Sequence, residues 1–218
     1  MSAMTTTLLS STQASEGAPG WRLSLGRLHL TVDCGSFDKA FALVNRVGAI
    51  AAGQNHHPEL DLRYSRVHLA VASHDVGGVT GRDLRFCALV SAALDELGLV
   101  PDNERLTEVE IAIDTLDAAA IAGFWAAVLG YERDGEDALV DPDRIGPSVW
   151  FQQLDEPRPV RNRIHLDVTV AHDEAASRRD RALAAGGRLV SDAAAPSFWI
   201  LADADGNEAC ICTWQGRD

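Results

Sequence analysis

The segment QNHHPELDLRYSRVHLAVASHDVGG, residues 54–78, decides the fold of the first half of the chain. It opens on two adjacent histidines and a proline, and Val67, Leu69 and Val71 then alternate with other residues, which predicts a β-strand. The strand ends at the triplet Ser73-His74-Asp75, so three of the seven histidines lie around one strand pair. Imidazoles grouped in this way indicate an acid/base site that needs no metal.

The chain before this segment predicts a lead-in, a hairpin and a helix. Residues 1–20 are rich in small and polar residues and end on a Pro-Gly breaker, so we expect a flexible lead-in that can contain a short helix around Leu8 to Ala14. Alternation over residues 21–33, interrupted by Gly26, predicts two antiparallel strands. Apolar residues at helical spacing after Ser36 predict a helix to about Ala52 that packs on the sheet.

After the segment, the sequence predicts a second helix and the end of the first domain. Thr80 and Asp83 have the spacing of a capping box, and Gly98 is a typical C-terminal stop. The first domain is therefore expected to span residues 21–99, followed by a linker at residues 100–106. Because helix capping explains Asp83 fully, we assign it no catalytic role.

Two further histidines, His29 and His68, alternate onto the polar sides of their predicted strands. Polar residues in such positions usually face solvent or an interface, so we assign them no role. Leu62 and Tyr64 are expected to belong to one short strand before the longer strand that carries His68. The first half is thus predicted to be an α+β domain.

Residues 107–218 form a second domain in which one pattern occurs twice. The pattern is strand, helix and further strands, with the helices at about 117–129 and 173–185. The repetition indicates an internal duplication. The two copies have little sequence identity, so the duplication is one of structure rather than of sequence.

Composition excludes several classes of function. The chain has 218 residues, of which 46% are hydrophobic and 23% charged, as in a globular protein with two cores. Its net charge of −13 and its lack of a basic stripe disfavour nucleic-acid binding. The four cysteines form no C-x-x-C pair, and neither a signal peptide nor a membrane span is recognisable. We therefore expect a cytoplasmic protein without nucleic-acid or membrane partners.

Residues 21–99 resemble the pterin-4a-carbinolamine dehydratase family. The resemblance rests on the His-His-Pro motif, Tyr64, the Ser73-His74-Asp75 triplet, the following Gly-Gly pair and Asp83, all at the family's spacing. It implies helices on one face of a four-stranded antiparallel sheet. It also implies a hydro-lyase without a cofactor, which removes water from 4a-hydroxytetrahydrobiopterin and gives a quinonoid dihydropterin.

The same resemblance implies which residues act on the pterin, the expected small-molecule partner. Imidazole can take or give a proton near neutral pH, as loss of water from a carbinolamine requires. Which histidine is the acid and which the base stays open. The family commonly has an acidic residue where this chain has Ala52, so one supporting carboxylate is missing. The implied acid/base residues are His56, His57 and His74, and the implied pocket residues are Pro58, Ser73, Asp75 and Val76.

The second half resembles the glyoxalase-like, vicinal oxygen chelate superfamily. The resemblance rests on three segments, Phe124 to Tyr131, Asn162 to Asp167, and Asp203 to Glu208. It implies two βαβββ modules that pair around a cleft, which holds a divalent metal in some members. The positions of the metal ligands fall on Glu110, Gln152, His165 and Cys210, although the second can equally fall on Gln153.

This set mixes a carboxylate, an imidazole and a thiol with an amide, which suits neither a hard cation nor zinc well, so the sequence favours a cleft that works without metal. A weak divalent-metal site stays the alternative. Three functions remain open: a dehydratase in the first half, a metal-dependent enzyme in the second half, or a non-catalytic small-molecule-binding protein of the resistance type. Both families commonly self-associate, so we expect a homo-oligomer.

Overall fold

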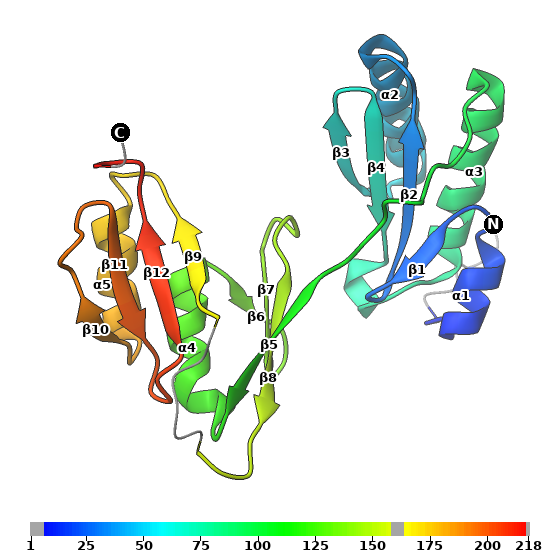
Figure 1. Cartoon of the computed structure of the whole chain (residues 1–218). Helices are drawn as coiled ribbons and strands as arrows, with labels where there is room; N and C mark the ends of the chain where they lie inside the picture. The colour runs from blue at the N-terminus through cyan, green and yellow to red at the C-terminus, as the bar shows by residue number, and fades with distance from the viewer. Residues whose placement is uncertain (1–6, 158–163, 217–218) are drawn as a thin grey trace. The chain divides into compact units, whose positions relative to one another are not determined.

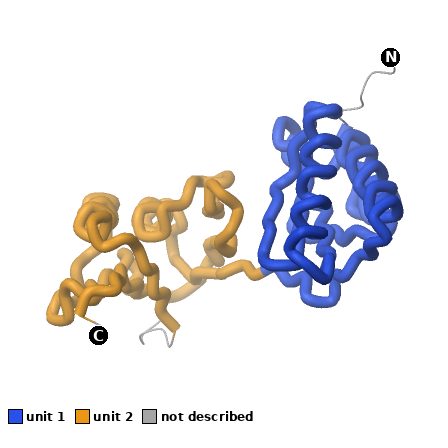
Figure 2. The backbone as a smooth tube through the Cα atoms, turned by 90° about the horizontal axis from the view of Figure 1, so that it is seen from above, with its two compact units in different colours: residues 1–108 blue, residues 109–218 orange. Residues whose placement is uncertain are grey.

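The computed structural model in Figure 1 describes residues 7–157 and 164–216. Contacts between Cα atoms divide the chain into two compact units, residues 1–108 and 109–218, which Figure 2 colours separately. No helix within the described residues is long and apolar enough to cross a membrane.

The first unit contains a four-stranded antiparallel sheet, as predicted. Alternate residues of the two central strands point to the same side and form the core. Tyr64 is not part of a strand, contrary to expectation, because the chain turns there with φ +55° and leaves the ring 90% exposed. The strands lie in the order β1 (Arg22–Ser24), β2 (Arg27–Asp33), β4 (Arg66–Val71) and β3 (Glu59–Arg63).

Helices α2 (Phe37–Gln54) and α3 (Gly81–Leu97) contribute apolar residues to the core on this side of the sheet. Ser36 caps α2 and the predicted Thr80–Asp83 capping box opens α3, which ends at Gly98. Helix α2 extends two residues beyond the predicted end, to a left-handed Asn55. Between β4 and α3 lies the short 3-10 helix η1 (His74–Val76).

The lead-in contains a short helix, as allowed by the sequence, but residues 7–20 are packed on the first core and not a flexible segment. Helix α1 (Ser11–Gly17) starts with a capping box at Ser10, and Ala14 and Ala18 are buried in the first core. A Cβ atom on Gly17 would lie 2.6 Å from a methyl carbon of Leu84, so the helix packs closely through small residues. Small residues give a weak hydropathy signal, which explains why the packing of this helix on the core was not expected. Residues 1–6 lie outside the described residues.

The predicted linker at 100–106 is bound to the first sheet. Strand β1 pairs only with the first part of β2 and leaves the backbone of Thr31 open on that side. The Asp102 N–H donates to Thr31 O at 2.7 Å, and Asn103 Oδ1 accepts from Thr31 N at 2.8 Å. Arg66 also donates to Asp102 Oδ2 at 2.6 Å. Unpaired backbone groups are costly to bury, so this segment completes the sheet.

The second unit contains the predicted duplication. Each module forms its own four-stranded sheet, in which the first strand pairs in parallel with the last and the other pairs are antiparallel. The first module comprises β5 (Glu110–Thr115), α4 (Ala118–Leu129), β6 (Glu132–Arg133), β7 (Ala138–Val140) and β8 (Ser148–Gln153). The second comprises β9 (Leu166–Thr169), α5 (Ala175–Ala184), β10 (Arg188–Ser191), β11 (Phe198–Ala202) and β12 (Glu208–Cys212).

A turn of the second module is hydrogen-bonded to the first. The Trp125 indole on α4 donates to Oδ2 of the buried Asp203 at 2.9 Å. Asp205 Oδ2 accepts from Thr115 Oγ1 at 2.5 Å and from Leu116 N at 3.1 Å. The acidic turn recognised in the sequence therefore has a structural role, because it joins the two modules.

Candidate active site and a second polar cluster

The end of α2 turns the His-His-Pro segment toward α3. Asn55 adopts the left-handed conformation with φ 48°, and the His56 N–H bonds back to Ala51 O at 3.1 Å. The His56 side chain is 11% exposed, and its ring meets the Phe86 ring edge-on at a centroid distance of 6.2 Å. The helix terminus and this aromatic contact together fix the position of the imidazole.

His56 is bound to Asp83, the residue that completes the capping box of α3. His56 Nε2 lies 2.7 Å from Asp83 Oδ1, and the Asp83 side chain is fully buried. The other oxygen, Oδ2, accepts from Ser73 Oγ at 2.7 Å, Thr80 N at 2.7 Å and Thr80 Oγ1 at 3.1 Å. Asp83 therefore caps the helix with one oxygen and binds the histidine with the other.

This arrangement selects one form of the imidazole. A carboxylate only accepts hydrogen bonds, so His56 donates through Nε2–H. In a neutral ring, Nδ1 then carries the lone pair and can accept a proton. The buried carboxylate would also stabilise the positive charge that forms on the ring when it does so. His56 can thus act as a base that Asp83 orients.

The structure joins only some of the predicted site residues. His56 and Ser73 meet through Asp83, with the Ser73 hydroxyl buried and used by that carboxylate. His57 and His74 are exposed, and no hydrogen bond or ion pair to either side chain occurs within residues 7–157 and 164–216. The other predicted pocket residues are the half-buried Pro58 and Val76 and the exposed Asp75.

Arg82 and Asp83 are the residues that sequence reasoning missed. Arg82 forms an ion pair with Asp75, whose pKa is lowered chiefly by this hydrogen bond. The Arg82 Nε atom is nevertheless buried without a hydrogen-bond partner. Gln54, His56 and Arg82 also line a small depression. The capping box pointed to Asp83, but capping alone does not show that the second carboxylate oxygen binds a histidine.

His29 is buried rather than at the surface, contrary to expectation, whereas His68 is half-buried. His29 is 0% exposed, and its Nδ1 lies 3.2 Å from His68 Nε2 with the two rings stacked. Burial, the Arg27 charge and the neighbouring His68 lower the pKa of His29 to about 4. The expectation failed because the segment after Asp102 lies next to His29: Glu108 Oε1 is 3.8 Å from His29 Nδ1.

The same segment borders a cavity of about 370 Å³ on this side of the sheet. Its charged groups are mixed in sign, and Arg66 is already paired with Asp102. The lining residues are Thr31, Asp61, Arg63, Arg66, His68, Arg105, Leu106, Thr107 and Glu108.

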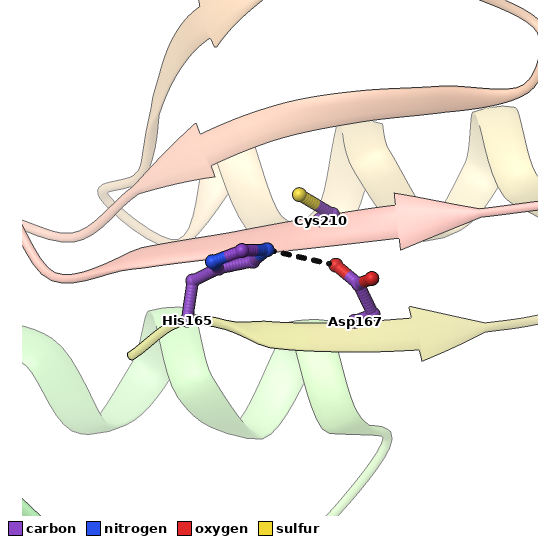
Figure 3. A group of neighbouring side chains, drawn as sticks. All are labelled: His165, Asp167 and Cys210. Atoms are coloured by element: carbon purple, nitrogen blue, oxygen red, sulfur yellow. Dashed lines mark ion pairs between the residues drawn. The ribbon is translucent and has the colours of Figure 1, made fainter. Parts of the chain in front are cut away.

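In the second unit, Glu110, one of the four positions that the superfamily resemblance gives for metal ligands, is not grouped with His165 and Cys210 among the described residues. Glu110 Oε1 accepts a hydrogen bond from Ser148 Oγ at 3.1 Å, and the Gln152 amide donates to Gln153 O at 3.3 Å. Two predicted positions, His165 and Cys210, do meet, but with Asp167 as the third residue of the group (Figure 3). Among the described residues, this is the one group of three or more acidic, His or Cys side chains close enough to share a metal ion.

Comparisons with known proteins assign a family to each unit. Residues 4–93 match the family model for pterin 4 alpha carbinolamine dehydratase, and residues 110–212 match the model for a glyoxalase-like domain. A protein of Acidobacterium capsulatum is 41% identical over 76 residues, which are 35% of this chain and 83% of that protein. One of Nocardia farcinica is 42% identical over 84 residues, 37% of this chain and 88% of that protein. Both are named "Putative pterin-4-alpha-carbinolamine dehydratase".

The chain therefore belongs to the pterin-4a-carbinolamine dehydratase family through its first unit, and its second unit is a glyoxalase-like domain. The resemblances found in the sequence are confirmed. One solved structure similar to a single unit is a transcriptional coactivator/pterin dehydratase from Brucella melitensis, which is 24% identical. The match covers 39% of this chain and 97% of that chain, and its TM-score is 0.38. A glyoxalase/bleomycin resistance protein/dioxygenase family enzyme from Burkholderia phytofirmans has 18% identity, 48% and 95% coverage, and a TM-score of 0.38.

Proposed function

We propose that the first unit is a hydro-lyase that dehydrates a 4a-hydroxytetrahydropterin to the quinonoid dihydropterin. The observation that carries this proposal is the 2.7 Å contact between His56 Nε2 and Asp83 Oδ1 within the motif of the dehydratase family. It gives one histidine of the motif a defined orientation and a free nitrogen for proton transfer. The named relatives support the same reaction.

The reaction breaks the C4a–O bond and forms a double bond between C4a and the neighbouring ring nitrogen. That nitrogen loses its proton, and the departing hydroxyl gains one and leaves as water. We assign the base to His56, because its Nε2–H is held by Asp83 and Nδ1 can accept the proton. The acid is His57 or His74, which are both exposed and free of other partners in the described structure. Asp83 is a positioning residue in this scheme.

The test is the rate of dehydration of a carbinolamine generated in the assay. His56→Ala should lower kcat by about two to four orders of magnitude, as expected for loss of a positioned acid/base group. His57→Ala and His74→Ala, compared at several pH values, decide which one is the acid. His172→Ala, an exposed histidine of the second unit, is the matched control and should leave kcat unchanged. An unchanged kcat in a folded His56→Ala variant would contradict the proposal.

A further inference from the structure

Strand pairing in the second module brings three side chains of types that can bind metals to one side of a sheet. Strands β9 and β12 run in parallel, and Asp167 on β9 lies directly opposite Cys210 on β12. His165 stands two residues before Asp167, so the alternation of an extended chain places it on the same side. Figure 3 shows the side chains of His165 and Asp167 close together beside β9, with Cys210 on the neighbouring strand β12.

The spacing of these atoms is that of a small coordination site. The ligand atoms of His165, Asp167 and Cys210 all lie within 4.8 Å of one another, and His165 Nε2 is 3.3 Å from Asp167 Oδ1. Tetrahedral zinc sites have bonds of about 2.0–2.1 Å to nitrogen or oxygen and about 2.3 Å to sulfur, which separates two ligand atoms by roughly 3.3–3.6 Å. The imidazole and the carboxylate are already at this spacing, and the thiol lies within 4.8 Å of both.

We propose that His165, Asp167 and Cys210 bind a zinc-type divalent cation in a site built entirely from the second module of the glyoxalase-like unit. The set differs from the four positions expected for the superfamily, because Glu110 and Gln152 take no part and Asp167 replaces them. A thiolate with an imidazole and a carboxylate favours zinc and similar borderline cations over magnesium or calcium, which prefer oxygen ligands alone.

Exposure gives the site a closed side and an open side. Cys210 is buried at 6% exposure, whereas the side chains of His165 and Asp167 are 46% and 59% exposed. Three protein ligands leave the fourth tetrahedral position for water or for an oxygen atom of a small molecule, as in zinc sites that bind substrates. On binding, the sulfur–hydrogen bond of Cys210 breaks, a metal–sulfur bond forms, and the proton passes to solvent.

The test is metal binding by the full-length protein, which does not depend on the dehydratase activity of the first unit. After treatment with a chelator, the protein is titrated with Zn²⁺ and with Co²⁺, and bound metal is measured by elemental analysis. We expect one equivalent, with a cobalt–thiolate charge-transfer band in the near ultraviolet. Cys210→Ser should abolish the band, and Asp167→Asn should weaken Zn²⁺ binding by more than ten-fold.

Two matched controls define the ligand set. Cys212→Ser alters a buried cysteine two residues along the same strand, and Glu110→Gln alters a position expected for the superfamily; both should bind one equivalent with the band intact. The proposal is overturned by the absence of saturable binding, by binding that survives both Cys210→Ser and Asp167→Asn, or by loss of binding in Glu110→Gln. If Cys210→Ser does not fold, Zn²⁺ binding by Asp167→Asn, a substitution at an exposed position, still tests the proposal.

Discussion

Replacing Asp83 by asparagine tests whether one carboxylate both starts α3 and orients His56. Asn keeps the size of the side chain, but only its Oδ1 atom accepts, whereas Nδ2 donates. The Thr80 N–H can only donate, so Oδ1 must face the helix cap and Nδ2 must face the imidazole. His56 Nε2 would then have to accept, which moves the ring proton to Nδ1. The atom available to the substrate would change from an acceptor to a donor.

The size of the effect follows from the contacts of Asp83. It is 0% exposed and accepts from His56, Ser73 and twice from Thr80. Hydrogen bonds to charged groups contribute about 1.5–3 kcal/mol, against about 0.5–1.5 kcal/mol for neutral pairs. Since the two hydroxyl groups can reorient, we expect Asp83→Asn to lower the free energy of unfolding by about 1–3 kcal/mol. It should lower kcat by about two orders of magnitude or more, because the ring tautomer is wrong.

Three measurements check this prediction. Urea unfolding gives the change in stability, nitrogen-15 NMR of the histidine ring gives the tautomer, and the dehydration assay gives kcat. Asp95→Asn is the matched control, because it makes the same substitution at an exposed position of the same helix. The reasoning is refuted if Asp83→Asn keeps the Nε2–H form of His56 together with wild-type kcat.

Two further predictions concern the buried groups outside the candidate active site. Burial, the Arg27 charge and the neighbouring His68 lower the pKa of His29 to about 4. Between about pH 6.5 and 4 the unfolded chain therefore binds a proton that the folded chain does not, and the free energy of unfolding falls as the pH falls. Between pH 7.5 and 4.5 the wild type should therefore lose roughly 2–3 kcal/mol more unfolding free energy than His29→Gln; an equal loss in both would contradict this. Trp125→Phe removes the indole donor from buried Asp203 and should destabilise the second unit by about 1–3 kcal/mol in urea unfolding followed by circular dichroism. The same change at Trp214, which is 61% exposed, should have little effect, and equal effects would argue against the hydrogen bond.

Features encoded by neighbouring residues could be predicted from the sequence. The helix start at Ser36, the capping box of Thr80 and Asp83, and the stop at Gly98 each depend on contacts within a few residues, and all three were found. The duplication was also visible, because each module repeats its strands and helix in the same order. Strand β6 is implied by the resemblance to βαβββ modules but could not be located from the residues, since two residues are too few to show alternation.

Features that depend on distant segments could not be predicted in this way. The burial of His29 requires a segment more than seventy residues further along the chain, and alternation within β2 says nothing about what covers its polar side. Asp167 was passed over as a ligand because its position opposite Cys210 follows from the pairing of β9 with β12. The binding of His56 to Asp83 likewise joins residues on separate elements, although each was noticed alone.

The attachment of residues 102–108 to the first sheet determines where the chain can be divided. A fragment cut after Leu99, where the last helix of this unit has ended, would expose the His29–His68 pair and leave the Thr31 backbone without Asp102 and Asn103. Such a fragment would expose unpaired backbone N–H and C=O groups of β2 and would be prone to aggregate. A stable, separately expressed dehydratase-like fragment should therefore extend through Glu108, and a protease that cleaves before Asp102 should destabilise it.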